Sequence, residues 1–494
     1  MKKRIFIASL ISLLIPGMIG FAQDKGYKDN LRQQFQDSQN SYQREFDGFQ
    51  NQNDSLFLSY LNQSWKEFKV FRNDRKTRPK PVIQPVAPVG IENIELPKPA
   101  QIIQIQSYDT IKSQTVNQPP TFNSLETVSS EIDYFDFLGQ KVGISKSGYK
   151  PIVAPDTRSR IIKFFETYTQ SERLNKITRE LFILSQTKQL NDWGFFYLLR
   201  IASASVFKDL NDQVLFTWAS LQKCGFDVKV AYNKEDIFLL AAFKEKLFST
   251  FYLSISGKNY DLLNFPAQPT ITEGVQSYES DYPGKVQLLS TFLSSIPRFA
   301  NHPEYKKLHF EEDTITLDLN INLIDFFKDY PECELVVYFN TPVSQHAMES
   351  FERKLVPLFI GKSEKEKVAI LLNMMHESFP YKPDQDQFGR EDYLFPDEAL
   401  FYPFTDCEDR AVLFSQLVSH YTTLTTVGLE YPDHVSVAVK FTEPIVGDYI
   451  VLNNDKYFIC DPTYIGAEIG MAMDSMKKSA PVIIPVIKID VTNQ

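Results

Sequence analysis

Near its C-terminal end the chain reads Asp406-Cys407-Glu408-Asp409-Arg410-Ala411-Val412-Leu413-Phe414. Ala411, Phe414 and Val418 recur at helical spacing, and an aspartate directly before such a run can cap a helix. The pattern therefore predicts a helix whose first turn holds Cys407. The exposed backbone N–H groups and the positive end of the helix dipole favour the thiolate there, which is the nucleophilic form of cysteine.

Two strand patterns that follow this helix carry a histidine and an aspartate. His434 opens the alternating run Val435-Ser436-Val437-Ala438-Val439-Lys440-Phe441, in which the valines and the phenylalanine share one strand face. The histidine lies on the opposite face, together with the small residues Ser436 and Ala438. Asp461 ends the strand-like run 456–460, and Pro462 stops the ladder after it. A carboxylate at such a sheet edge can hold an imidazole in one tautomer.

In these three segments the chain resembles the transglutaminase-like superfamily. The match consists of Asp406-Cys407 at a helix start, His434 in a strand and Cys460-Asp461-Pro462-Thr463 after the next strand, within residues 365–470. The resemblance implies an α+β, papain-like C-terminal domain with Cys407 as nucleophile, His434 as base and Asp461 as the residue that orients the base. It also implies a peptide, isopeptide or glutamine amide as substrate. The chain departs from the family pattern at Val435-Ser436, where small and aromatic residues are usual, which leaves the shape of the substrate cleft open.

Each of the three residues also has a structural explanation when taken alone. Cysteines on apolar helical stripes are usually inert, histidines at strand starts are commonly structural, and an aspartate before proline commonly forms a turn. In addition, three carboxylates beside Cys407 disfavour its thiolate unless Arg410 or His434 offsets them.

Two functional hypotheses follow from these residues. The first is an exported thiol enzyme that forms an acyl-enzyme at Cys407 and resolves it with water, as a peptidase or amidase, or with an amine, as a cross-linking enzyme. Hydrolysis is the favoured outcome of the two. The second hypothesis is a non-catalytic envelope scaffold or binding protein built on transglutaminase-like domains.

An earlier segment, residues 205–266, has the same order of one helix and several strand-like runs. The two segments align at an offset of about 198 residues, with Val214-Leu215-Phe216 parallel to Val412-Leu413-Phe414. The positions that correspond to the cysteine, the histidine and the aspartate are Asp209, about Glu235, and Asn264. We therefore predict a degenerate copy of the same unit without a nucleophile or a base. Chance similarity between amphipathic helices followed by strands is the alternative explanation.

The N-terminal residues indicate where this chemistry would take place. Met1-Lys2-Lys3-Arg4 precedes an apolar run from Ile5 to Ile15, and Gly20-Phe21-Ala22 forms a small-x-small cleavage site. These features are typical of a signal peptide. We therefore expect a periplasmic or extracellular protein without a transmembrane anchor in the mature chain.

An aromatic stripe and a proline-rich stretch follow the signal peptide. Aromatic and leucine side chains recur at helical spacing from Tyr27 to Trp65 and Phe68, which predicts an amphipathic helical arm, and the prolines between Pro79 and Pro99 predict a semi-extended tether. The arm packs on its own domain, binds an envelope protein partner or associates with a second copy of itself. The expected organisation is a signal peptide (1–22), a helical arm (23–72), a Pro-rich linker (73–121), a mixed α/β domain with the degenerate copy (122–275), a connector (276–310) and the transglutaminase-like domain (311–494).

The last domain has further local patterns before Cys407. They predict strands at 314–322 and 335–339 and helices near 343–359 and 363–379. The stretch from Phe379 to Thr405 is a long aromatic loop, and long loops inside compact domains are often functional. Candidates for the walls of a substrate cleft in this loop are Tyr381, Tyr393, Phe395 and Tyr402.

Composition excludes several classes of function. The formal net charge is −10 without a basic stripe, which argues against nucleic acid as a principal partner. The sequence has no P-loop, dinucleotide glycine motif, zinc-protease His-Glu pair or Cys-x-x-Cys pair, and its 6 histidines are scattered, so we expect no cofactor and no metal. The 4 cysteines do not make a disulfide scaffold. Whether Cys224 and Cys333 pair is left open, and Cys460 should point to the strand face opposite that of Asp461.

Overall fold

The computed structural model describes residues 54, 57–59, 61–62, 65–75, 132–271, 274–279 and 286–487. The chain divides into two compact units, Met1–Tyr60 and Leu61–Gln494, and all elements described below belong to the second unit. The expected signal peptide and nearly all of the expected Pro-rich linker lie outside the described residues. The second unit is a mixed α and β structure, in agreement with the α+β prediction.

No helix within the described ranges has the length and apolar character that crossing a bilayer requires.

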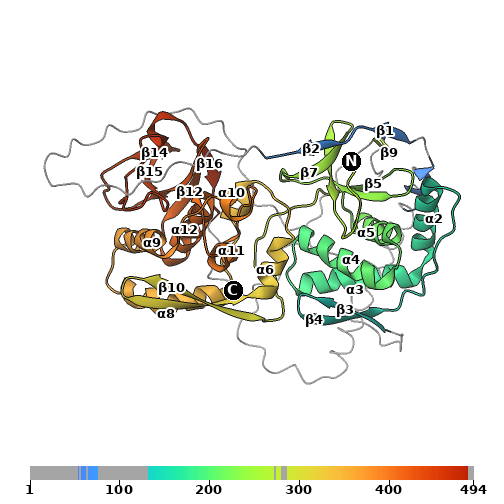
Figure 1. Cartoon of the computed structure of the whole chain (residues 1–494), viewed down its shortest axis with the longest axis horizontal. Helices are drawn as coiled ribbons and strands as arrows, with labels where there is room; N and C mark the ends of the chain where they lie inside the picture. Colours follow the sequence, from blue (N-terminus) through green and yellow to red (C-terminus); the bar gives the residue numbers. More distant parts are fainter. Residues whose placement is uncertain are drawn as a thin grey trace, which may run out of the picture. The chain divides into compact units, whose positions relative to one another are not determined.

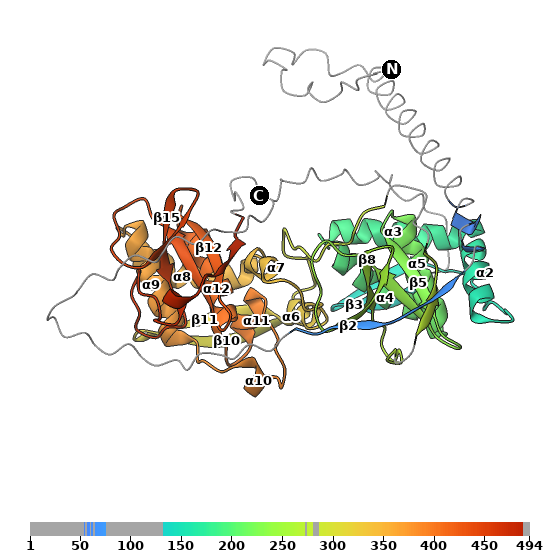
Figure 2. The ribbon, with the colours of Figure 1, turned by 90° about the horizontal axis from the view of Figure 1, so that it is seen from above.

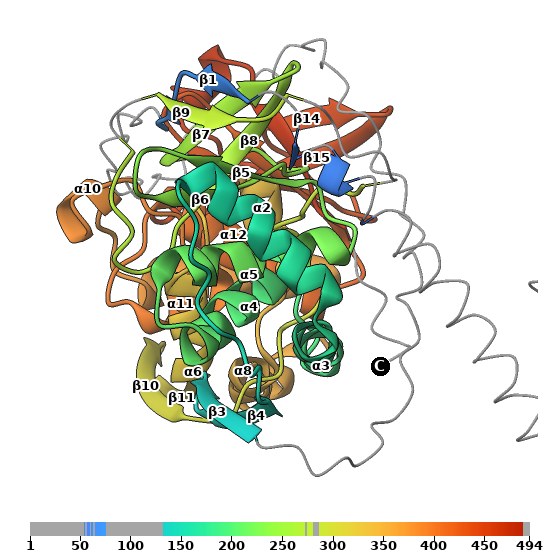
Figure 3. The same ribbon diagram turned by 90° about the vertical axis from the view of Figure 1, so that its right-hand side faces the viewer.

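The first region, residues 132–279, consists of a β-hairpin, four helices and a set of antiparallel strands (Figure 1). Its elements are β3 (Ile132–Phe137), β4 (Gln140–Ser145), α2 (Thr157–Gln170), α3 (Glu172–Thr187), α4 (Asp192–Val206), α5 (Leu210–Lys223), β5 (Val228–Tyr232), β6 (Ile237–Ala241), β7 (Thr250–Ile255), β8 (Lys258–Leu263) and β9 (Val275–Ser277). With the short strands β1 (Lys66–Phe68) and β2 (Phe71–Asn73), β5 to β9 form a seven-stranded sheet in the order β1-β9-β5-β6-β8-β7-β2. Helix α5 packs against β5 and β6 (Figure 3).

Each of these four helices begins at a side chain that accepts a backbone N–H. The caps are Asp156 for α2, Ser171 for α3, Asn191 for α4 and Asp209 for α5. Such a cap pairs one of the N–H groups that a helix start leaves without a partner, and it typically stabilises the protein by about 1 kcal/mol. Helix α5 is buried along most of its length, so it is the central helix of the first region.

We call residues 65–75 the strap. The sequence predicts that a helix continues through Phe68, but the strap instead forms the two short strands β1 and β2. β1 pairs with β9 and β2 pairs with β7, which lie at opposite ends of the strand order. The strap therefore joins both edges of the sheet and pairs backbone groups that an open edge would leave exposed. Trp65, predicted on the helical stripe, instead packs against Tyr232 and Tyr278 at ring-centroid distances of 5.3 and 5.2 Å.

The second region, residues 303–487, also begins with a hairpin and ends in antiparallel strands (Figure 2). Its elements before the candidate cysteine are β10 (Pro303–Phe310), β11 (Asp313–Asn320), α6 (Ile321–Lys328), α7 (Leu335–Phe339), α8 (Gln345–Phe359), α9 (Glu364–Ser378), α10 (Asp384–Gln387) and α11 (Pro396–Phe401). The remaining elements are α12 (Cys407–Tyr421), β12 (Thr425–Glu430), β13 (Val435–Lys440), β14 (Tyr449–Leu452), β15 (Asp455–Cys460), the short helix η1 (Met476–Lys478) and β16 (Val482–Pro485). Strands β12 to β16 form a sheet in the order β14-β15-β13-β12-β16, and α12 packs against β12 and β13.

Two sequence predictions for this region need correction. Because β10 pairs with β11, the region begins at Pro303, inside the segment expected to be a connector. The expected strand 335–339 is the helix α7, and the hydroxyl of Thr341, just after its end, donates to the carbonyl of Val337 at 2.9 Å. An apolar run of this length has no resolvable period, so burial alone does not distinguish a strand from a helical turn. Strand β11 and helices α8 and α9 lie where the patterns predicted them.

The two sheets share a strand order. The order is β9-β5-β6-β8-β7 within the first and β16-β12-β13-β15-β14 in the second, and in both the helix directly before the strands packs against the first two of them. The regions differ in the connection before that helix. Residues 207–209 join α4 to α5, whereas residues 379–406 join α9 to α12. We call residues 379–406 the α9–α12 connection.

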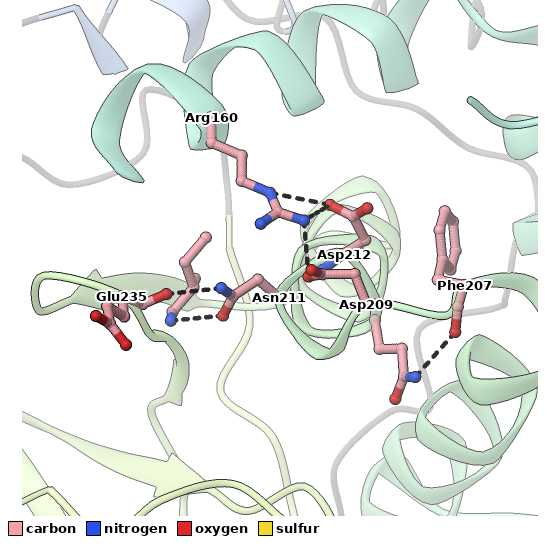
Figure 4. Close-up of polar contacts among 8 residues, drawn as sticks. Arg160, Phe207, Asp209, Asn211, Asp212 and Glu235 are labelled. Carbon is pink, nitrogen blue, oxygen red and sulfur yellow. Dashed lines mark hydrogen bonds and ion pairs between the residues drawn. The ribbon is translucent and has the colours of Figure 1, made fainter. Parts of the chain in front are cut away.

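Asn211 joins the first turn of α5 to the turn between β5 and β6 (Figure 4). Its Oδ1 accepts the N–H of Ile237 at 2.8 Å, and its Nδ2 donates to the carbonyl of Glu235 at 2.8 Å. We expect Asn211→Ala to destabilise the first region by about 1–2 kcal/mol, because both backbone groups lose a partner. Asn211→Asp keeps the acceptor and should cost less.

Urea unfolding followed by tryptophan fluorescence measures this difference, since all 3 tryptophans of the chain lie in the strap or the first region. Equal destabilisation by the two substitutions would contradict the role assigned to the Asn211 acceptor.

Candidate active site

The predicted helix start at Cys407 is present in the structure. Asp406 is the N-cap residue of α12, and Oδ2 of Asp409 accepts the N–H of Asp406 at 3.1 Å. The Cys407 thiol donates to Oε2 of Glu408 at 2.8 Å, and Cys407 is 1% exposed. The thiol proton is thus engaged by a neighbouring carboxylate on the same helical turn.

His434 and Asp461 are brought together by the pairing of β13 with β15. Val437 lies opposite Cys460, so the next residue along β15, Asp461, comes level with Ser436. His434 Nε2 donates to Asp461 Oδ2 at 2.9 Å. Nδ1 of His434 is buried and has no hydrogen-bond partner among the described residues. Because Nε2 carries the shared proton, Nδ1 is the basic nitrogen in this tautomer.

Asp461 is a buried carboxylate with three hydrogen-bond donors. Its Oδ1 accepts the N–H groups of Thr463 and Tyr464 at 3.0 and 3.2 Å, and its Oδ2 accepts from His434. Burial by itself raises the pKa of Asp461, but His434 and the two backbone N–H groups outweigh burial and hold the pKa below its usual value. Asp461 is therefore ionised at neutral pH and can fix the orientation of the imidazole.

Two further side chains hold the main chain around Asp461, and the sequence patterns assigned neither of them to this role. His376, in the last turn of α9, donates from Nε2 to the carbonyl of Asp461 at 3.0 Å. Arg410, on α12, donates from Nη1 to the carbonyl of Pro462 at 3.4 Å. The first turn of α12 and the end of α9 are thereby both tied to the segment that carries Asp461.

The candidate residues are closed off from solvent. Cys407 and His434 are 1% exposed, and Asp461 is 0% exposed. The α9–α12 connection packs against the same helix start, since the N–H of Leu394 donates to Oδ1 of Asp409 at 3.0 Å. A substrate can therefore reach Cys407 only if a covering segment moves.

The four aromatic candidates for cleft walls lie in this connection. Tyr393 and Phe395 are only 5% and 1% exposed, and Phe395 stacks on Phe327 at a centroid distance of 4.4 Å. Tyr381 and Tyr402 are half-buried. Tyr393 and Phe395 therefore anchor the connection to the core instead of lining an open cleft.

Carboxylates gather around the thiol more densely than the local sequence indicates. Ligand-type atoms of Asp406, Cys407 and Glu408 lie within 4.8 Å of one another, and so do those of Asp384, Asp406 and Asp409. Burial, followed by the charges of Asp406 and Glu408, raises the pKa of Asp409 well above its usual value. These oxygens are of the type that holds Mg²⁺ or Ca²⁺, and protonation of Asp409 is a second way to relieve their repulsion.

All four cysteines lie in the described residues, and all are thiols. Cys224 and Cys333 do not pair. Burial raises the pKa of each of these two thiols to about 12. Cys460 is fully buried in β15, as expected for a small hydrophobic side chain.

In the first region, the helix and strand starts show that two of the three positions equivalent to the candidate residues differ by one residue from those expected from the sequence. Asp209 is the N-cap of α5, so Leu210 is the residue that stands where the cysteine stands in α12. Asp236, and not Glu235, directly precedes β6, as the histidine directly precedes β13. Asn264 follows β8 as the aspartate follows β15. Leu210, Asp236 and Asn264 carry neither a thiol nor an imidazole.

The start of α5 instead carries ion pairs (Figure 4). Nη2 of Arg160 lies 2.7 Å from Oδ1 of Asp209 and 2.6 Å from Oδ1 of Asp212. These contacts tie α2 to α5. The polar residues at this helix start therefore have a structural role.

No family model, curated protein or solved structure matches this chain. The interpretation of the site consequently depends on its geometry and on the motif described above.

Arg75 of the strap contacts several parts of the second unit. Its guanidinium lies 3.5 Å from the ring centroid of Tyr393 and 4.3 Å from that of Phe248. It also pairs with Glu332 at 2.8 Å and donates to the carbonyl of Cys333 at 2.6 Å. The strap therefore anchors the α9–α12 connection through Tyr393.

We expect Arg75→Ala to raise the rate of iodoacetamide alkylation of Cys407 by about tenfold. Loss of a largely desolvated cation–π contact of about 1–2 kcal/mol would increase the population of the open connection by that factor. Peptide mass spectrometry of the alkylated protein measures the rate. Arg72→Ala is the matched control, because the Arg72 side chain is 55% exposed. Wild-type rates in both variants would contradict the role of Arg75.

Glu398, in α11, makes the closed connection sensitive to pH. It is 5% exposed and accepts the N–H of Phe395 at 3.2 Å. Burial raises its pKa to about 8. Between the ordinary pKa of a glutamate and this raised value, the folded state keeps the proton and the unfolded state does not, so stability falls as the pH rises.

We expect hydrogen exchange of the α9–α12 connection, corrected for intrinsic rates, to become faster as the pH rises from about 5 to 8. Glu398→Gln should reduce this dependence, because a glutamine stays neutral throughout, and the part that remains comes from Asp397 and Asp409, whose pKa values burial also raises. Glu349→Gln, at an exposed position on α8, is the control and should leave the dependence as in the wild type. The same dependence in wild type and Glu398→Gln would rule out Glu398 as its source.

Proposed function

We propose that the second region is a papain-like, transglutaminase-like domain and that the protein is a thiol enzyme acting on a peptide, isopeptide or glutamine amide. The observation that carries the proposal is the buried His434–Asp461 hydrogen bond of 2.9 Å, which joins the start of β13 to the end of its partner strand β15. Strand β13 packs against the helix that begins at Cys407. The Nε2–Asp461 contact supports it further, because it leaves Nδ1 as the nitrogen that can accept a proton.

The chemistry assigns one step to each residue. The thiol rotates from Glu408 and gives its proton to Nδ1 of His434, and Sγ then bonds to the amide carbon. As the C–N bond breaks, Nδ1 returns the proton to the leaving nitrogen, which leaves a Cys407 acyl-enzyme. Backbone N–H groups at the start of α12 would form part of the oxyanion hole.

Water resolves the acyl-enzyme in this proposal. It gives a proton to Nδ1 and bonds to the acyl carbon, the C–S bond breaks, and the proton returns to Sγ. The closure of the site favours hydrolysis over cross-linking, because water enters a narrow opening more easily than the amine of a second protein. The expected signal peptide would place the reaction in the periplasm or outside the cell.

The first region is, in the same proposal, a degenerate copy of this domain. The shared strand order and the matching helix before each sheet support a duplication. Leu210 and Asp236 at the positions of the nucleophile and the base make this copy inactive. It would then serve the architecture or bind a partner together with the predicted N-terminal arm.

The alternative is a non-catalytic envelope scaffold, and two observations favour it. The three candidate residues are at most 1% exposed, and the thiol donates to Glu408. A packed thiol of this kind is what a scaffold needs, whereas an enzyme also needs a route to Cys407.

The pH dependence of iodoacetamide labelling at Cys407, compared between wild type and His434→Ala, separates the two functions. An activated pair should label well below the ordinary thiol pKa of about 8.5 and lose this reactivity by tenfold or more in the variant. Cys224 is the internal control in each sample, because burial raises its pKa to about 12. Labelling of Cys407 that is indifferent to His434 would favour the scaffold.

A further inference from the structure

We propose that Arg410 is a positioning residue of the reaction, which holds the main chain carrying Asp461 in register with the helix turn that carries Cys407. The proposal rests on the proposed function. Arg410 is 1% exposed and lies one helical turn after Cys407. Its role would be exerted through Asp461 and His434, without contact to the substrate.

The guanidinium of Arg410 reaches three separate segments. Nε donates to the hydroxyl of Thr405 at 3.2 Å, Nη1 donates to the carbonyl of Pro462 at 3.4 Å, and Nη2 donates to the carbonyl of Phe379. Thr405 and Phe379 lie at the two ends of the α9–α12 connection, and Pro462 directly follows Asp461. One side chain therefore fixes the helix start, the ends of its cover and the chain that carries the carboxylate.

The equivalent residue in the first region shows which of the Arg410 contacts the fold alone would require. Gln213 is the fourth residue of α5, as Arg410 is the fourth residue of α12. Gln213 Nε2 donates to the carbonyl of Phe207 at 2.9 Å, and Phe207 is the C-cap of α4 (Figure 4). Phe379, which Arg410 contacts, is likewise the C-cap of α9. A glutamine is thus sufficient to tie the central helix to the end of the helix that precedes it in the core.

Arg410 also makes contacts that Gln213 does not make, with Thr405 and with the carbonyl of Pro462 beside Asp461. A buried guanidinium is costly, so an arginine is expected here only if its further hydrogen bonds matter. The hydrogen bond from Arg410 to the Pro462 carbonyl is separate from its hydrogen bond to Phe379. The bond to Pro462 restrains the residue next to Asp461. A displacement of about 1 Å in a catalytic group can lower a rate about 100-fold, so loosening this restraint should disturb the His434–Asp461 pair.

The test is the substitution Arg410→Gln in the full chain, with Gln213→Ala as the matched control. Arg410→Gln should keep the far-UV circular dichroism of the wild type, because glutamine makes the equivalent contact in the first region. It should shift the pH profile of Cys407 alkylation towards that of His434→Ala and slow alkylation below pH 7 by about tenfold. Gln213→Ala loses a helix-end contact of the same kind and should leave the profile unchanged. A purely structural role would alter stability without moving the profile. Arg410→Lys keeps the positive charge but not the three guanidinium contacts, so it should shift the profile as Arg410→Gln does, and a wild-type profile in Arg410→Lys would assign the shift to charge and overturn the positioning role.

The outcomes are distinguishable. A wild-type pH profile in Arg410→Gln overturns the positioning role and leaves the proposed enzyme intact. Failure of Arg410→Gln to fold, or an equal shift in Gln213→Ala, also overturns the role, because the argument requires glutamine to suffice for the fold. If wild type and His434→Ala label alike, the proposed function itself fails, and the role of Arg410 in a reaction fails with it.

Discussion

The ionised carboxylate of Asp461, placed out of contact with water, is the constraint on which the candidate site depends. A buried carboxylate without partners costs several kcal/mol, so the chain must bring donors to it from several segments. His434 and two backbone N–H groups bind the carboxylate, and His376 binds the main-chain carbonyl of the same residue. One buried charge thus fixes β13, the end of β15 and the end of α9 relative to one another.

Burial both strengthens the site and closes it. Electrostatic attraction between His434 and Asp461 is larger in a dry interior than in water, but the same exclusion of solvent keeps a substrate away. Different segments of the chain hold the candidate residues and enclose them. The candidate residues lie on α12 and at the ends of strands, whereas the cover is a connection held at Tyr393 by the strap residue Arg75. The middle of this connection is thus anchored at Tyr393, whereas its two ends share the anchor Arg410 with the segment that carries Asp461.

Local patterns in the sequence are sufficient to predict the helix and the strands that carry the candidate residues. An N-cap before an apolar stripe predicts the start of α12, and strict alternation predicts β13, because both signals arise within a few neighbouring residues. His376 has no such signal, since its partner Asp461 lies 85 positions away. The strap differs from the predicted helix for a related reason. Its aromatic spacing suits a helix, but its structure is determined by pairing with the edges of a sheet whose strands are distant in the sequence. The run 335–339 is too short for any period to be read from it.

The strand order of the second region does not by itself require the polar residues of the candidate site, because the first region has the same order with different residues. The first region has the same strand order with ion pairs between Arg160 and two aspartates at its helix start, and with Gln213 where the second region has Arg410. The second region instead buries a thiol, an imidazole, a carboxylate and a guanidinium in one place. Buried polar groups that a fold does not require persist either to specify packing or to perform chemistry. The first region has the same strand order without a thiol or an imidazole at its helix start, so the strand order alone does not account for the set of buried groups in the second region.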